Sequence, residues 1–161
     1  MRVCIIFYNL GGYHLARLDA TNRYCVSKGW DFNAIEITRT TSEHPWGVLD
    51  NPDYVTTLIQ HQDGRTPSLE NQQLLDSALD ELNPDAVAIP GWGHDFSRRA
   101  LKWCQRKAKR AILMSESKYD DAPRFWLKEL AKKWLYVRRF DSAVVGGERH
   151  RLVAADIDLD A

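Results

Sequence analysis

The sequence predicts an α/β fold, a three-layer domain with a mainly parallel sheet of six to seven strands and helices on both faces. Two observations carry this prediction. Short apolar runs alternate with amphipathic stretches along the chain, and that alternation is typical of parallel strands joined by helical crossovers. The length of 161 residues suits one domain with a full core. We therefore expect residues 1–161 to form a single domain.

The expected strands are apolar runs rich in β-branched and aromatic residues, which is typical of strands buried on both faces. They lie at 2–8, 30–38, 54–60, 85–90, 110–115 and 141–145. The expected helices lie at about 14–28, 67–82, 95–109, 123–139 and 148–155. In the first helix, Leu15, Leu18, Tyr24 and Cys25 are available for the buried side.

Composition narrows the class of protein. Hydrophobic residues make up 44% and charged residues 27% of the chain, as in an ordinary soluble protein. No apolar run approaches the ~20 residues that span a bilayer, and the N-terminus lacks a secretory signal pattern. Cys4, Cys25 and Cys104 share no metal-ligand spacing and have apolar neighbours, so we expect reduced structural thiols in a cytoplasmic protein.

Charge is unevenly distributed although the net charge is zero. Acidic residues dominate 50–85, and Lys and Arg dominate 98–139, which predicts a positive face in the later half. Trp103, Trp126 and Trp134 lie among these basic residues. Basic residues with aromatics suit an anionic membrane surface. Membrane association is therefore one functional interpretation of this stretch. Core packing of the tryptophans is the alternative, and nucleic acid is disfavoured as a partner.

The strand ends carry the candidate functional residues, because the carboxyl ends of parallel strands meet at one ligand-binding edge. Residues 11–14 read Gly-Gly-Tyr-His, residues 91–94 read Gly-Trp-Gly-His, and residues 115–118 read Ser-Glu-Ser-Lys. Glu116 and His14 are the candidate catalytic residues. The candidates for binding substrate or phosphate are Gly11, Gly12, Tyr13, Trp92, His94, Ser115 and Lys118.

Several familiar chemistries are disfavoured at this edge. The sequence has neither G-x-G-x-x-G nor the P-loop Gly-Lys-Ser/Thr, which disfavours nicotinamide and P-loop enzymes. No catalytic triad or metal-ligand cluster stands out, so we expect no metal or other cofactor. Structural interpretations stay open. The glycines permit a tight turn, Glu116 caps a helix or is a loop carboxylate paired with Lys118 or Arg124, and Trp92 packs over the sheet edge.

Several stretches together resemble the N-terminal half of GT-B-fold glycosyltransferases of the group-1, family-4-like type. They are residues 9–18, 28–32, 83–87, 110–116 and 138–148, which follow the order and spacing of that family's segments. The resemblance implies a Rossmann-like acceptor domain in which Gly11 and Gly12 lie beside the donor phosphates. The family often has a histidine after the fifth strand, where this chain has Ser115 and Glu116.

The resemblance also implies a partner. The family's second domain binds the nucleotide-sugar donor without a metal, and its Glu-x7-Glu motif does not occur in these 161 residues. We therefore expect an acceptor-binding half that is inactive alone and works with a donor-binding domain or subunit, in cis or in trans. Its acceptor would be a sugar, lipid or glycan. The alternative function is a non-catalytic binding module whose basic face meets a membrane or a protein partner.

Overall fold

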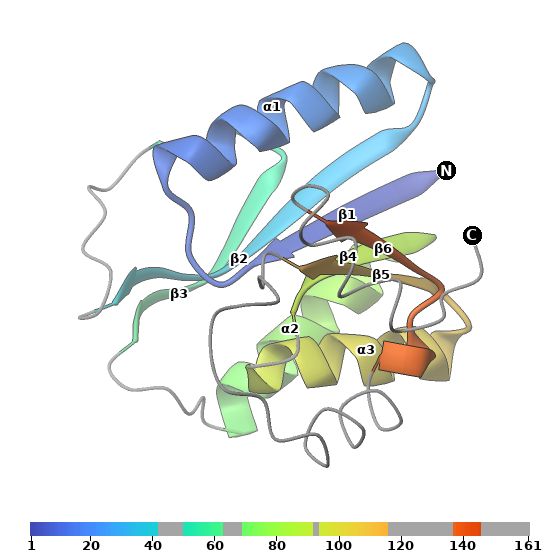
Figure 1. The fold of residues 1–161 in the computed structure, drawn as a ribbon. Helices are drawn as coiled ribbons and strands as arrows, with labels where there is room; N and C mark the ends of the chain where they lie inside the picture. The colour runs from blue at the N-terminus through green and yellow to red at the C-terminus, as the bar shows by residue number, and fades with distance from the viewer. Residues whose placement is uncertain (42–49, 63–68, 92–93, 116–136, 146–161) are drawn as a thin grey trace, which may run out of the picture.

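The fold was analysed in a computed structural model that describes residues 1–41, 50–62, 69–91, 94–115 and 137–145. Its six strands form one all-parallel sheet in the order β3-β2-β1-β4-β5-β6 (Figure 1). The elements are β1 Arg2–Phe7, α1 Gly12–Ser27, β2 Asp31–Thr41, β3 Val55–Gln62, α2 Leu69–Leu82, β4 Ala86–Pro90, α3 Asp95–Lys107, β5 Arg110–Ser115, the 3₁₀ helix η1 Val137–Arg139 and β6 Ser142–Val145. The predicted α/β fold is confirmed.

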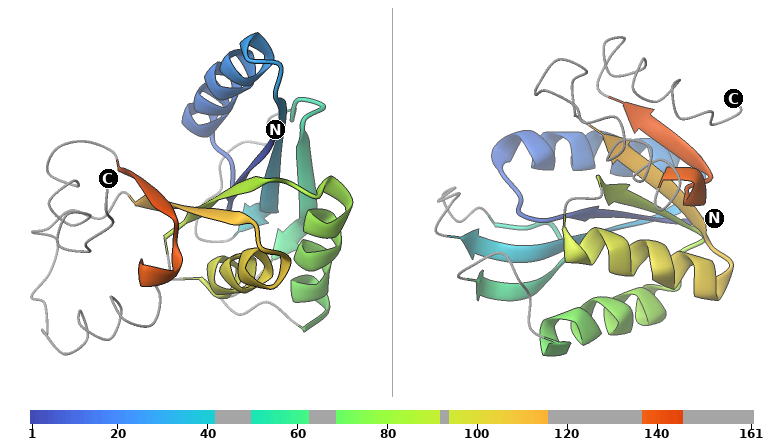
Figure 2. Two further views of the ribbon diagram at one scale, coloured as in Figure 1. Left: turned by 90° about the vertical axis from the view of Figure 1, so that its right-hand side faces the viewer. Right: turned by 60° about the horizontal axis from the view of Figure 1, so that its bottom comes forward.

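The three layers follow from the alternation of side chains along the strands. In β1, Cys4 and Ile6 are buried in the core that α2 and α3 cover. Ile5 and Phe7 point the other way and pack in the cluster that contains Leu18 of α1. Accordingly, α1 lies over one face of the sheet and α2 and α3 lie over the other (Figures 1 and 2).

Some predicted boundaries are wrong. Helix α1 begins at Gly12 instead of residue 14, because the carbonyl of Gly11 already accepts bonds from the N–H groups of His14 and Leu15. Strand β2 runs on to residue 41 because it stays paired with β3. Tyr24 is 56% exposed instead of buried, and its ring makes an edge-on contact with Trp30.

The later predicted helices lie largely outside the described residues. Of the helix expected over 123–139, the structure describes only 137–139, which form η1. The helix expected over 148–155 falls outside the described part of the chain. No helix among the described residues is long and apolar enough to cross a membrane.

The acidic and basic stretches of the sequence pair with each other across α2 and α3. The Arg99 guanidinium donates two hydrogen bonds to the Asp76 carboxylate, with both N–O distances at 3.0 Å. Arg106 forms an ion pair with the same carboxylate at 3.0 Å. Lys107 lies 2.7 Å from Asp80, and its hydrogen bond lowers the pKa of that carboxyl. Within the described part of the chain, Arg99, Arg106 and Lys107 of the predicted positive face are therefore paired with acidic residues of α2.

Trp103 belongs to the core instead of a membrane-facing surface. It is 1% exposed, and its indole N–H donates to Asp80 at 3.0 Å. This burial removes Trp103 from the aromatic residues that favoured membrane binding. Trp126 and Trp134 lie outside the described residues.

All three cysteines are buried free thiols, as the sequence predicts. Cys4 of β1 and Cys104 of α3 are both 0% exposed and share one core cluster. Burial raises the pKa of each of these two thiols to about 12. Burial is also what raises the pKa of Cys25.

The buried thiols predict a loss of stability in alkali. The unfolded chain releases thiol protons near pH 9 while the folded chain keeps them, so the free energy of unfolding falls as pH rises from about 9 toward 12. The maximum slope is about 1.4 kcal/mol per pH unit for each thiol. Urea unfolding at pH 8, 9 and 10 measures it. The Cys4→Ala/Cys104→Ala double variant should have a flatter profile, and an equal slope in both proteins would contradict this account.

Candidate functional site

The strand order fixes one special position at the carboxyl edge of the sheet. Chain order runs outward from β1 to β2 and β3 on one side, and from β4 to β5 and β6 on the other. The direction therefore reverses between β1 and β4, and such a switch point is where open parallel sheets bind ligands. The segments that follow β1 and β4 are residues 8–14 and 91–94. Most of the predicted site residues lie in these two segments.

Two backbone donors at the start of α1 are open. The N–H of Gly11 donates to Nδ1 of His14 at 3.1 Å, and the N–H of Leu10 donates to Glu36 at 2.9 Å. The next two N–H groups, those of Gly12 and Tyr13, have no hydrogen-bond acceptor within the described part of the chain. Because these donors lie at the positive end of the helix dipole, they favour a negatively charged ligand.

The bond from Gly11 also sets the state of the His14 ring. Nδ1 can accept a hydrogen bond only while it carries no proton, so in this arrangement the ring proton lies on Nε2. The ring also packs on Phe7, with 4.8 Å between ring centroids. His14 is thus held at the helix start as a positioned imidazole.

His94 lies across the switch point from α1 and stacks on Tyr8. The ring centroids are 4.8 Å apart and the planes are within 8° of parallel. Tyr8 follows β1 and His94 precedes α3, so this stack bridges the two strands at the point where chain order reverses. The bridge brings together the residues after β1 and after β4, as the sequence predicts for this edge.

The turn that carries His94 is fixed by the backbone and by Ser97. Gly91 has φ of +53°, a left-handed conformation that glycine adopts without strain. The Ser97 hydroxyl donates to the carbonyl of Pro90 at 2.7 Å, which ties the first turn of α3 to the end of β4. The start of α3 is therefore held against the strand end.

Glu36 is the main support of this site, and sequence reasoning missed it. Its carboxylate is 2% exposed within β2. One oxygen accepts from the N–H of Leu10, and the other accepts from Asn51 at 2.9 Å and from the Thr57 hydroxyl at 2.8 Å. Because all these bonds engage the carboxylate, it holds the turn after β1 in place. A single acid within the apolar run 32–37 was the signal in the sequence.

Asn9 is a second support that the sequence did not reveal. It is 7% exposed, and its side-chain amide donates to the carbonyls of Thr38 and Arg39 at 3.0 and 2.7 Å. These bonds tie the chain after β1 to the far end of β2. The amide oxygen of Asn9 is buried and has no hydrogen-bond partner among the described residues.

Tyr13 marks the outer border of the α1 start. Its ring is 64% exposed, and the Arg17 guanidinium lies over it, 4.2 Å from the ring centroid. An exposed aromatic ring beside an open N–H donor suits contact with a sugar or a base. An arginine on its face adds positive charge near the same helix end.

The predicted residues divide into three groups. Gly11, Gly12, Tyr13 and His14 lie together at the start of α1, and the Tyr8 stack brings His94 to the same switch point. Ser115 ends β5, in register with residue 145 of β6. Trp92, Glu116 and Lys118 lie outside the described residues, and their roles stay predictions. We call residues 8–14 together with Gly91 and His94 the switch-point rim.

Among the described residues, no group of three or more His, Cys, Asp or Glu side chains could hold a metal ion. The expectation that the protein works without a metal stays a prediction.

Comparison with known proteins gives similarity in fold alone. No protein-family model matches the sequence, and the search of curated proteins gives no match. Among solved structures, the chain is similar to a putative UDP-N-acetylglucosamine 2-epimerase from Listeria monocytogenes, with a TM-score of 0.56 and 14% identity. The similarity covers 97% of this chain and 42% of that one.

A second solved structure is an alpha-glucosyltransferase in complex with UDP and a mismatched 13-mer DNA. It has a TM-score of 0.48 and 14% identity, and the similarity covers 90% of this chain and 37% of that one. A TM-score below 0.5 does not by itself establish a common fold.

The fold and the switch-point rim define the class: a Rossmann-like α/β domain with its candidate site at the carboxyl edge of the sheet. More particularly, it is similar in structure to one Rossmann-like half of GT-B-fold enzymes. The chain spans less than half the length of the epimerase that it matches.

Proposed function

We propose that this chain is the acceptor-side half of a glycosyltransferase that moves a sugar from a nucleotide-sugar donor to an acceptor. The observation that carries the proposal is the pair of open N–H donors of Gly12 and Tyr13 at the switch point. They lie where a parallel sheet binds phosphate groups. The similarity to a protein named as a UDP-sugar epimerase supports a nucleotide-sugar ligand.

In this proposal the rim residues have distinct roles. Gly12 and Tyr13 donate to the donor phosphates, and His14 and His94 contact the sugars from opposite sides of the switch point. Glu116, after β5, is the proposed catalytic carboxylate, with Ser115, Lys118 and Trp92 as binding residues. A donor-binding half, in cis or in trans, completes the enzyme, which works in the cytoplasm without a metal.

A second candidate is an epimerase half, and its support is the similarity to the Listeria monocytogenes protein, which is named as an epimerase. The two functions share a nucleotide-sugar ligand and differ in product. Incubating the completed enzyme with the nucleotide-sugar alone separates them. An epimerase changes the sugar stereochemistry without an acceptor, whereas a transferase needs one.

The proposal is tested by removing one backbone donor from the rim. Gly12 is the first helical residue, where proline is tolerated, and Gly11 before it is extended, as a residue before proline prefers. Gly12→Pro should therefore remove an N–H without unfolding α1. Since this half is proposed to contact the donor phosphates, we expect the affinity of the 161-residue protein for uridine diphosphate, measured by calorimetry, to fall about tenfold or more, the effect of losing one hydrogen bond to a charged group.

Gly12→Ala is the matched control, because alanine keeps the N–H and Gly12 is exposed. We expect it to bind uridine diphosphate within about threefold of the wild type, since no hydrogen bond to the ligand is lost. Equal binding by the proline variant, or an equal loss in both variants, would overturn the role of this donor.

A further inference from the structure

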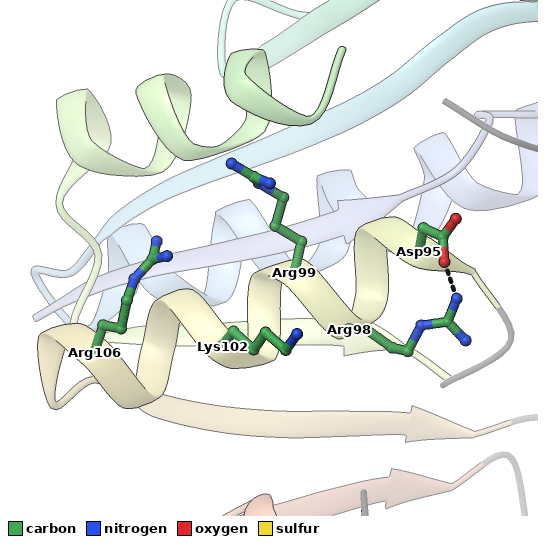
Figure 3. A pocket seen from close by; sticks show the side chains of 5 residues that line it. All are labelled: Asp95, Arg98, Arg99, Lys102 and Arg106. Carbon is green, nitrogen blue, oxygen red and sulfur yellow. Dashed lines mark ion pairs between the residues drawn. The ribbon is translucent and has the colours of Figure 1, made fainter. Parts of the chain in front are cut away.

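Helix α3 carries an open groove that begins at Asp95, the residue after His94 of the switch-point rim, and runs along the helix to Arg106. The groove has a volume of about 260 Å³. Its lining residues recur along one side of the helix: Asp95, Arg98, Arg99, Lys102 and Arg106 (Figure 3). No residue of the rim lines it, so the groove is a separate feature of the surface.

The lining of the groove carries four basic side chains and one acidic side chain. Arg99 and Arg106 reach to the side of α2 (Figure 3) and share the single carboxylate of Asp76. Arg98 pairs with Asp95 one turn before it. Lys102 has no ion-pair partner within the described part of the chain. Among the described residues, the printed ion pairs of the groove involve two carboxylates, Asp95 and Asp76, and none of them involves Lys102.

Two of the cations are available to a ligand. The fork to Asp76 holds Arg99 in place as a wall of the groove. The Arg98–Asp95 pair is a surface pair, with side chains 39% and 33% exposed. A pair of that kind contributes only about 0.2–1 kcal/mol, so an anion can draw Arg98 away from Asp95. Arg98 and Lys102 are four residues apart and therefore neighbours on the helix.

Neither the helix dipole nor the packing of α3 against α2 explains the positive charges of Arg98 and Lys102. Arg106 and Lys107 complement the carboxyl end of the helix, where the dipole favours positive charge. Arg98 and Lys102 lie outside the last turn of α3. Neither contacts the acidic residues of α2 in any described ion pair.

We propose that the α3 groove binds a compact anion that carries at least two phosphate charges, of the pyrophosphate class. Arginine and lysine are the side chains that recognise phosphate oxygens. The volume lies just below the ~300–1,000 Å³ of sites for drug-sized ligands, so a small ligand fits. The lining contains no aromatic or aliphatic residue, which disfavours base stacking and insertion into a bilayer. This site is independent of the proposed function.

The test is binding of inorganic pyrophosphate to the 161-residue protein at low salt, followed by amide chemical shifts. We expect saturable shifts at residues 98–106. Lys102→Glu and Arg98→Gln should each weaken affinity about tenfold, as for the loss of one hydrogen bond to a charged group. Arg23→Gln, at an exposed position on α1, is the matched control and should bind like the wild type. Gly12→Pro should leave the shifts on α3 unchanged, which separates this site from the rim.

Two outcomes would overturn the proposal. One is the absence of saturable shifts on α3 up to millimolar pyrophosphate. The other is that the protein associates with vesicles of phosphatidylglycerol and phosphatidylcholine, while pyrophosphate neither binds α3 nor competes with the vesicles. The groove would then bind an extended lipid surface.

Discussion

Replacing Glu36 by alanine should lower the free energy of unfolding by about 3–4 kcal/mol. The substitution removes the acceptor for the buried N–H of Leu10 and for the side chains of Asn51 and Thr57. A buried donor left without an acceptor costs ~1–3 kcal/mol, and bonds to charged groups are the stronger ones. Since Asn51 and Thr57 are only half buried, they can turn to water, so the Leu10 donor and the lost packing account for most of the effect. Urea unfolding measures the change.

Two further variants sharpen this result. Glu36→Gln keeps the shape but places an NH₂ group against a donor, so its effect should be smaller than that of alanine and still exceed about 1 kcal/mol. Glu81→Ala, at an exposed position on α2, should change stability by less than about 0.5 kcal/mol. If Glu36→Ala were as mild as Glu81→Ala, Glu36 would not hold the turn after β1.

Replacing Trp103 by alanine should cost about 3–5 kcal/mol, the range for truncating a large buried aromatic side chain. Trp103 is 1% exposed and is among the largest fully buried side chains in the described part of the chain. It also packs where α3 meets the sheet, so the cavity opens in the main core cluster. Its indole N–H bond to Asp80 adds a link between α3 and α2.

Trp103→Phe separates packing from that hydrogen bond. Phenylalanine fills much of the space but donates nothing to Asp80, so we expect a loss of about 1–2 kcal/mol. Gln105→Ala, at an exposed position of the same helix, should be nearly neutral. If Trp103→Ala changed the free energy of unfolding by less than about 1 kcal/mol, the burial of Trp103 would be contradicted. Trp103 would then again be available as an aromatic residue for membrane binding by the basic helices.

The layers of this fold could be predicted from the sequence because each strand is a short apolar run with a helix-length segment after it. The strand 110–115 was predicted with the bounds that the structure has. The predicted ends of helices and strands were less accurate where backbone hydrogen bonds decide them. Gly11 caps α1 through its carbonyl, and nothing in the side-chain pattern reveals that. Tyr24 was expected inside on its aromatic character, but it is 56% exposed.

The candidate site could be predicted only in outline. The sequence placed Gly12, His14 and His94 at one edge, but their positions across the switch point depend on strand order, which no local pattern encodes. Glu36 and Asn9 escaped notice because each acts on backbone groups that are distant in sequence. The pairing of Asp76 with Arg99 also needed the packing of α2 against α3.

The most direct test of the functional account is an amide chemical-shift map of the protein with uridine diphosphate. We predict saturable shifts that centre on Gly12 and Tyr13 and extend to His14 and His94, and we predict that Gly12→Pro reduces them while Gly12→Ala keeps them. Shifts confined to α3, or none at millimolar ligand, would contradict the assignment of the switch-point rim as the site that contacts the donor phosphates.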